Sequence, residues 1–168
     1  EICRAFVEVS GRLPLVFSVH PRTNRRIREM GLLRRLRKST RVRLLSPVTY
    51  VESLALAHAS SVVITDSGGL QREAFWLRRP CLVVRRTTEW PETMVRRTVL
   101  LSSPKSATIV RRVHELLQLG NLTLGKPSSM IIRNSPFGDG HAATRIVQDL
   151  KQHLQEKLRR PGEKRCVA

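Results

Sequence analysis

Acidic residues are scarce in this sequence, and aromatic residues are scarcer still. Asp and Glu together number 13 against 31 Lys and Arg, which gives a formal net charge of +18 at pH 7. Such a charge is typical of proteins that associate with nucleic acid or an anionic surface. Aromatic residues make up only 4% of the chain, so few side chains could stack on bases. The composition therefore argues against nucleic acid as the partner and favours arginine spread over a solvated surface.

Long apolar runs and closely spaced cysteines are also missing. No apolar run approaches the roughly 18 residues that a membrane-spanning helix needs, so we expect no membrane partner. The three cysteines, Cys3, Cys81 and Cys166, lie far apart in the chain. Their number and spacing support neither a disulfide framework nor a zinc site. We therefore expect no metal ion.

The size of the chain allows one domain with a substantial core. It has 168 residues, of which 40% are hydrophobic. It begins with Glu1 rather than Met, and no basic, apolar and small-residue leader follows. We expect the chain to be a fragment or a processed product.

Short apolar runs alternate with segments of helical periodicity. The runs that fit buried strands lie at residues 15–20, 41–45, 62–65, 81–85 and 98–101. The helical patterns lie at residues 23–36, with a break at Gly31, and at residues 50–59, 70–78, 106–119 and from His141 onward. Thr23 is the expected cap of the first helix. This alternation predicts an α/β fold, a Rossmann-like parallel sheet with helices on both faces.

The C-terminal part has a different character. Residues 120–140 are rich in Gly, Pro, Ser and Asn and are expected to form a loop. The helix expected over residues 141–160 has an apolar residue at every fourth position, which gives it a long apolar stripe. Residues 161–168 are expected to be a frayed tail.

Ligands of open parallel sheets sit beyond the carboxyl ends of the strands. In this chain those ends are followed by His20, by Asp66 to Gly69, and by Arg85 to Glu89. Several polar groups are therefore predicted to meet on one rim of the sheet. This rim is the best candidate for a site.

Ser67, Gly68 and Gly69 connect a strand directly to a helix. Glycine lets a ligand approach the backbone closely, and the first amides of a helix attract a phosphate. Ser67 would add a hydroxyl donor. The alternative is a purely structural tight turn. The strand and the helix on either side favour the phosphate-binding interpretation.

Four further residues at or near the rim each have an ordinary alternative role. Glu73 lies one helical turn after Gly69 and could accept hydrogen bonds from ribose hydroxyls, although it could also be a surface residue near a helix start. His20 could donate to a phosphate or could simply cap its strand. Glu89 and Glu92 could be paired acids or parts of a solvated turn. The residues support no Ser/His/Asp or Cys/His arrangement.

Five segments carry a resemblance to a known family. They are HPRT (20–23), PVTY (47–50), TDSGGLQREA (65–74), RPCLVVRRTTEWPE (79–92) and NSPFGDGHAATRIV (134–147). Through them the chain resembles the C-terminal, UDP-binding half of the non-hydrolysing UDP-N-acetylglucosamine 2-epimerases. The segments occur in the family's order and span nearly the whole chain.

This resemblance implies a fold, a reaction and a binding site. The fold is the C-terminal half of a glycosyltransferase-B-like enzyme, with a Rossmann-like UDP-binding domain over residues 1–150. The enzyme is a cytoplasmic isomerase that interconverts UDP-GlcNAc and UDP-ManNAc by elimination and re-addition of UDP, and it needs no cofactor. By similarity His20 contacts the diphosphate, Ser67, Gly68 and Gly69 cradle it, and Glu73 holds the ribose.

Several positions depart from the family's pattern. Val48 and Ser53 stand where polar and aromatic residues lie near uracil, and Trp90 replaces an Arg near the phosphates. Arg72 stands where the family has Glu, and Arg97 where it has Gly. Losing a stacking aromatic costs about 1–3 kcal/mol, and losing a charge-assisted contact costs a similar amount. These departures predict weaker binding of UDP unless Arg72 or Arg86 compensates.

The family's catalytic carboxylates belong to an N-terminal domain that these 168 residues do not contain. The resemblance therefore predicts that this chain binds a UDP-sugar but is inactive alone, because acid–base groups must lie within hydrogen-bond reach of the substrate. The helix at 141–160 would pack across to the missing domain, and a homodimer is possible. Two alternatives remain: the donor domain of a glycosyltransferase-B enzyme, and a basic nucleic-acid-binding module on the same fold.

Overall fold

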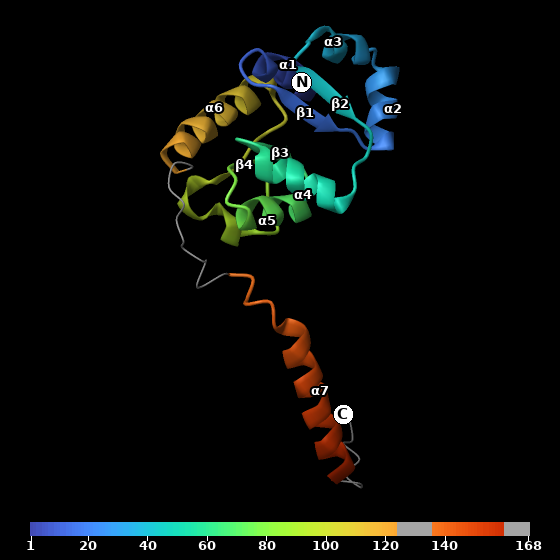
Figure 1. The fold of residues 1–168 in the computed structure, drawn as a ribbon, viewed down its shortest axis with the longest axis vertical. Helices are drawn as coiled ribbons and strands as arrows, with labels where there is room; N and C mark the ends of the chain where they lie inside the picture. Colours follow the sequence, from blue (N-terminus) through green and yellow to red (C-terminus); the bar gives the residue numbers. More distant parts are fainter. Residues whose placement is uncertain (124–135, 160–168) are drawn as a thin grey trace. The chain divides into compact units, whose positions relative to one another are not determined.

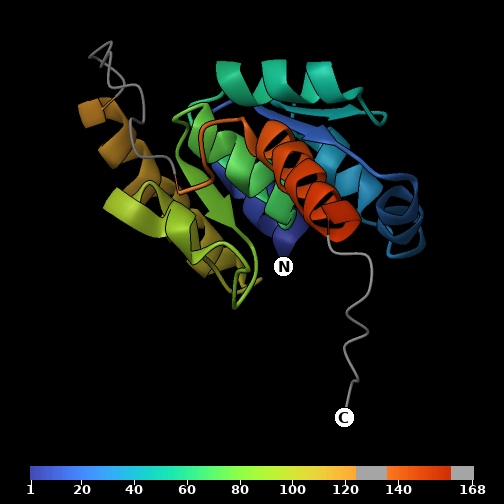
Figure 2. The same ribbon diagram turned by 90° about the horizontal axis from the view of Figure 1, so that it is seen from below.

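The computed structural model describes residues 1–123 and 136–159. The chain divides into two compact units, Glu1–Pro127 and Ser128–Ala168. Figures 1 and 2 show their helices and strands from two directions. Among the described residues, no helix has both the length and the apolar character that crossing a membrane requires.

The first unit alternates helices and strands. In chain order they are α1 (Ile2–Ser10), β1 (Leu15–Ser18), α2 (Pro21–Glu29), α3 (Leu33–Lys38), β2 (Val42–Leu45), α4 (Tyr50–Ala59), β3 (Val63–Thr65), α5 (Gly68–Trp76), β4 (Cys81–Val83), the 3₁₀ helix η1 (Pro91–Arg97), β5 (Val99–Leu101) and α6 (Ser106–Thr123). Each of the five strands lies within a range predicted from apolar runs. The α/β fold class predicted from the sequence is confirmed.

All strand pairs in the described residues are parallel, in two hydrogen-bonded sets. The strand β1 pairs with β2, and β4 lies between β3 and β5. The two sets share a core, because Leu15 of β1 and Ile64 of β3 pack against the same buried clusters. The expected single sheet is therefore present as two adjoining hydrogen-bonded parts.

Alternating side chains of β4 place helices on both faces of the β3–β4–β5 sheet. Leu82 packs in a buried cluster with residues of α1 and α6. Its neighbours Cys81 and Val83 pack on the opposite side with Ala57 of α4 and Ala74 of α5. Successive side chains of a strand point to opposite faces, so the apolar run 81–83 requires cover on both.

Two details of the sequence-based prediction are corrected at helix ends. The second helix begins at Pro21 with His20 as its N-cap, so Thr23 is not the cap. Proline suits the first position of a helix because its missing N–H would have no partner there. The second correction concerns the C-terminal end of α6, which continues to Thr123. The loop predicted at 120–140 therefore begins later than expected. Residues 124–135 of that loop lie outside the described part.

The second unit contains α7 (Ala142–Arg159), which begins within a residue of the predicted start. Asp139 accepts a hydrogen bond from the backbone N–H of His141 at 3.1 Å and pairs with Arg145, which fixes the start of the helix. The predicted apolar stripe is exposed at Ile146 (59%), Leu150 (56%) and Leu154 (60%). The predicted tail, 161–168, lies outside the described residues.

Candidate functional site

The turn from β3 to α5 is held by two side chains. Thr65 Oγ1 accepts a hydrogen bond from the N–H of Ser67 at 2.9 Å. Ser67 is the N-cap of α5, and its Oγ accepts from the N–H of Leu70 at 3.4 Å. A hydroxyl that accepts one hydrogen bond still has its own proton to donate. The predicted role of Ser67 as a donor is therefore compatible with its role as a cap.

The first backbone amides of α5 remain available to a ligand. The N–H groups of a helix's first turn have no partner within the helix. In the described part of the chain, no residue accepts a hydrogen bond from the N–H of Gly68 or Gly69. These amides carry the positive end of the helix dipole, so the arrangement suits a phosphate.

The two glycines of this turn have different surroundings. A Cβ added to Gly68 would lie 2.9 Å from Nε1 and 3.3 Å from Cδ1 of Trp90, and 3.5 Å from a carboxylate oxygen of Glu89. A Cβ added to Gly69 would meet only the hydroxyl of Ser67, at 3.5 Å. Gly68 is therefore required by the close approach of the loop that carries Trp90, and Gly69 is not.

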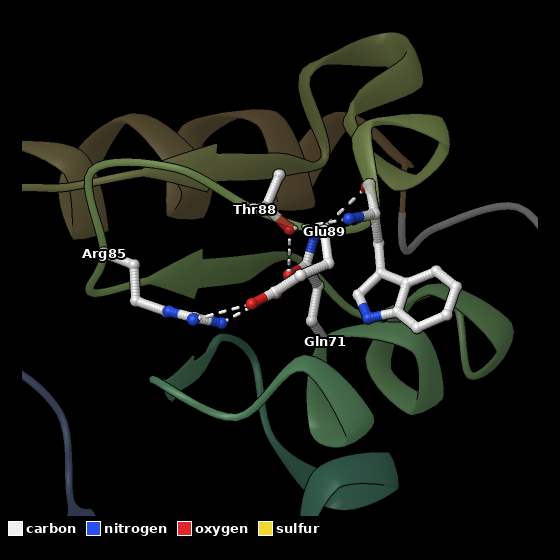
Figure 3. A network of polar contacts seen from close by, with 5 residues as sticks. Gln71, Arg85, Thr88 and Glu89 are labelled. Carbon is white, nitrogen blue, oxygen red and sulfur yellow. Dashed lines mark hydrogen bonds and ion pairs between the residues drawn. The ribbon is translucent and has the colours of Figure 1, made fainter.

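Gln71 connects that loop to α5 (Figure 3). Its side chain is fully buried, and its Oε1 accepts a hydrogen bond from Thr88 Oγ1 at 2.7 Å. Its Nε2 donates to Thr93 Oγ1 at 2.6 Å and to the carbonyl of Trp90 at 3.3 Å. The same threonine hydroxyl at position 88 accepts from the N–H of Trp90 at 3.0 Å. Gln71 thus fixes the backbone of the loop over the start of α5.

Arg85 and Glu89 close the other side of the loop. Two parallel hydrogen bonds of 2.8 and 2.7 Å join the guanidinium to the carboxylate (Figure 3). These bonds are the main reason why the pKa of Glu89 is lowered from its ordinary value. A neighbouring acid would have raised that pKa. Glu89 therefore acts as the partner of an arginine and not as half of an acid pair with Glu92.

Arg72 and Trp90, two of the departures from the family pattern, contact each other. The guanidinium carbon of Arg72 lies 4.1 Å from the centre of the Trp90 ring, the geometry of a cation–π interaction. Within the described residues, the buried Nε of Arg72 has no hydrogen-bond partner. The contact places the positive charge of Arg72 against Trp90, and the compensation predicted for Arg72 stays a prediction.

His20 follows β1 in the way that Ser67 follows β3. Its Nδ1 accepts a hydrogen bond from the N–H of Arg22 at 3.3 Å, so the ring caps α2. In a neutral ring whose Nδ1 accepts, the proton is on Nε2, where it can be donated to a ligand. The side chain is exposed. Capping and ligand contact are compatible here.

Glu73 is half-buried in the second turn of α5. In the described part of the structure its carboxylate has neither a hydrogen bond nor an ion pair. Val48 and Ser53 flank the capping box of α4, in which Thr49 and Glu52 bond reciprocally. No group of three or more His, Cys, Asp or Glu residues in the described part of the chain could hold a metal ion. The roles predicted for His20, Ser67, Gly68, Gly69, Glu73, Val48, Ser53 and Trp90 stay predictions.

Gln71 is the important residue that the sequence reasoning did not single out. It lies within the segment TDSGGLQREA, and a glutamine on the sheet-facing side of a helix was the available signal. Its partners are 17 to 22 residues further along the chain. Only the tertiary structure brings them together.

The fold and the site define a class of protein. Parallel sheets with helices on both sides, and a capped helix start beside a strand end, belong to the Rossmann-like domain of glycosyltransferase-B-like proteins. The family model for UDP-N-acetylglucosamine 2-epimerase matches residues 1–151. The chain therefore belongs to the UDP-N-acetylglucosamine 2-epimerase family.

Individual relatives agree with this assignment. The chain is 35% identical over 133 residues to a UDP-N-acetylglucosamine 2-epimerase of Methanococcus maripaludis, covering 79% of this chain and 34% of that protein. It is 35% identical over 156 residues to the enzyme of Escherichia coli K12, covering 91% of this chain and 40% of the relative. The chain thus spans about two fifths or less of these relatives.

A solved structure supports the same relationship. The Methanocaldococcus jannaschii UDP-GlcNAc 2-epimerase, in complex with UDP-GlcNAc and UDP, superposes with a TM-score of 0.69 at 32% identity. The match covers 87% of this chain and 37% of that structure.

Proposed function

We propose that this chain is the nucleotide-binding half of a UDP-GlcNAc 2-epimerase and that it binds the UDP portion of the substrate at the start of α5. The observation that carries the proposal is the capped helix start, where the amides of Gly68 and Gly69 have no partner in the described residues. Diphosphate is the group that such a helix start favours. The relative solved with UDP-GlcNAc and UDP supports the choice of nucleotide.

Each predicted contact has a specific role in binding the nucleotide. The amides and the hydroxyl of Ser67 would donate to diphosphate oxygens, and His20 would donate from Nε2. Glu73, which has no partner in the described structure, would accept from the ribose hydroxyls. Arg72, held by Trp90 at 4.1 Å, would supply positive charge beside the diphosphate.

Calorimetric titration with UDP tests the proposal. We expect saturable binding, weakened about tenfold by Ser67→Ala and by Glu73→Gln, since each removes one hydrogen-bonding group from a charged or polar ligand. Glu8→Gln is the control, because Glu8 is an exposed carboxylate on α1. Absence of heat at millimolar UDP, or an equal effect of all three substitutions, would remove the binding role.

We further propose that the chain does not epimerise UDP-GlcNAc alone. Acid–base catalysis at the sugar needs carboxylates within hydrogen-bond reach, and the relatives are more than twice as long as this chain. Proton NMR of UDP-GlcNAc incubated with the chain should show no UDP-ManNAc. Product that forms in proportion to the chain, and is lost in Ser67→Ala, would contradict this. The homodimer and the cytoplasmic location stay predictions of the family resemblance.

A further inference from the structure

The end of α2, the connection at Gly31 and the short helix α3 line an open hollow that lies apart from the rim. It has a volume of about 520 Å³. Its lining consists of Arg28, Gly31, Leu33, Arg34, Arg37 and Lys38. We call it the α2–α3 hollow; the two helices are labelled in Figure 1. His20 lies at the opposite end of α2, about 13 Å away along a nine-residue helix.

Four cations line this hollow and no acid does. None of the four side chains has a hydrogen-bond or ion-pair partner within the described residues. The single acid between residues 21 and 38 is Glu29, which pairs with Arg26 at 3.1 Å and is not part of the lining. Like charges around one concavity repel each other, and a bound anion would relieve that repulsion.

The helix dipoles favour the positions of only three of these four cations. Arg28, Arg37 and Lys38 lie in the last turns of their helices, where cations are favourable. Arg34 is the second residue of α3, where the dipole disfavours a cation. Its position is unfavourable for the helix but adds a fourth cationic residue to the lining of the hollow.

The shape of the hollow suits a small ligand. Its volume is within the ~300–1,000 Å³ typical of small-molecule sites, and because the hollow is open to solvent a ligand held there would stay partly exposed. Gly31 has φ +67°, and an added Cβ there would meet nothing within 4 Å, so the glycine is needed for its backbone conformation and leaves the space open. Leu33 offers an apolar surface, and no aromatic side chain lines the hollow for stacking on a base.

We propose that the α2–α3 hollow binds a small molecule that carries two or more phosphate groups. Arginine forks match phosphate oxygens in pairs, and three arginines and a lysine exceed what one carboxylate could engage. The site is separate from the proposed UDP site and does not depend on it. Bound anion would bridge α2 to α3 across Gly31.

Inorganic tripolyphosphate is the probe, and amide NMR of the whole chain is the readout. We expect saturable shifts centred on Gly31 and Arg34 with one tripolyphosphate bound at the hollow, distinct from any shifts of Gly68 and Gly69 at the proposed UDP site. The double variant Arg34→Gln/Arg37→Gln should weaken binding by about tenfold or more. The double variant Arg25→Gln/Arg35→Gln is the matched control, since it removes two exposed arginines from the same two helices outside the lining. Its affinity should change less than about twofold.

Three outcomes would overturn the proposal. Equal weakening by both double variants would show a diffuse charge effect. Shifts that do not saturate would show an adventitious ion only. Displacement of tripolyphosphate by random-sequence duplex, with shifts along all of α2 and α3, would assign the surface to nucleic acid. Ser67→Ala should leave tripolyphosphate binding at the hollow unchanged, which separates this test from that of the UDP site.

Discussion

Gly68 is the residue on which the local architecture of the site depends most directly. The 2.9 Å approach of Trp90 leaves no room for a side chain at position 68, whereas position 69 has room. Moving the indole aside would disturb its contact with the guanidinium of Arg72, which lies 4.1 Å from the ring centre. Two glycines that look equivalent in the sequence therefore tolerate substitution differently.

Gly68→Ala should lower the free energy of unfolding by about 1–3 kcal/mol, the usual effect of forcing an atom into packed surroundings. Gly69→Ala is the matched control and should change it by less than about 1 kcal/mol, or raise it, since alanine is favoured in helices. Urea unfolding measures both. In Gly68→Ala/Trp90→Ala most of the loss should disappear; a strictly additive double variant would contradict the assigned contact.

Gln71 is the second residue with a specific structural role. Gln71→Leu leaves the hydroxyls of Thr88 and Thr93 without their buried partner, so we expect a loss of about 1–3 kcal/mol in the free energy of unfolding. Gln118→Leu, on the exposed side of α6, is the control and should have little effect. If the two variants unfolded at the same urea concentration, the network would not stabilise the loop.

At the scale of elements, α4 offers a test with a defined pH dependence. Hydrogen bonds from the backbone and side chain of Thr49 lower the pKa of Glu52 below its ordinary value of 4.5. A carboxyl whose pKa is lowered by folding stabilises the protein above its unfolded-state pKa. That contribution is lost as the pH falls through the lowered, folded-state value.

As the pH falls from about 6 to about 3, the Glu52→Gln variant should therefore lose less stability than the unsubstituted chain. The urea midpoint of each protein across this range is the measurement. Glu8→Gln serves as the control, since that carboxylate has no hydrogen-bond partner in the described residues. An unchanged acid dependence in Glu52→Gln would mean that the capping box of α4 does not contribute.

The helices and strands were the part of the structure that could be predicted best from the sequence. Apolar runs located every strand, and the boundaries of α4 agree with the predicted range 50–59. The start of α2 was misplaced because Thr23 is a good cap by residue type, whereas His20 followed by proline determines the actual start. The helix α1 was not predicted, although its buried residues Ala5, Phe6 and Val9 have helical spacing.

The site was predictable in its local part only. Ser67 lies between a strand and a helix, and serine is a common N-cap. The residues next to it in the sequence are therefore enough to predict this cap. The contacts of Gln71 and the stacking of Arg72 on Trp90 join residues about 20 positions apart. Their geometry depends on how η1 and the loop before it pack on α5.

At the scale of the whole molecule, α7 has an exposed stripe of apolar side chains. Ile146, Leu150 and Leu154 are each more than half exposed. Isolated apolar residues on a surface are ordinary, but a row of them on one helix face usually marks an interaction surface. The packing of α7 on an N-terminal domain stays a prediction of the family resemblance.

The stacking of Arg72 on Trp90 also constrains how this sequence can change. An arginine at position 90, as the family resemblance implies, would place two guanidinium groups side by side and remove the ring that holds one of them. A glutamate at position 72 alone would put a carboxylate near the helix start that we propose binds the diphosphate. Each replacement by itself is therefore unfavourable, so we expect positions 72 and 90 to vary as a pair among chains that share this loop.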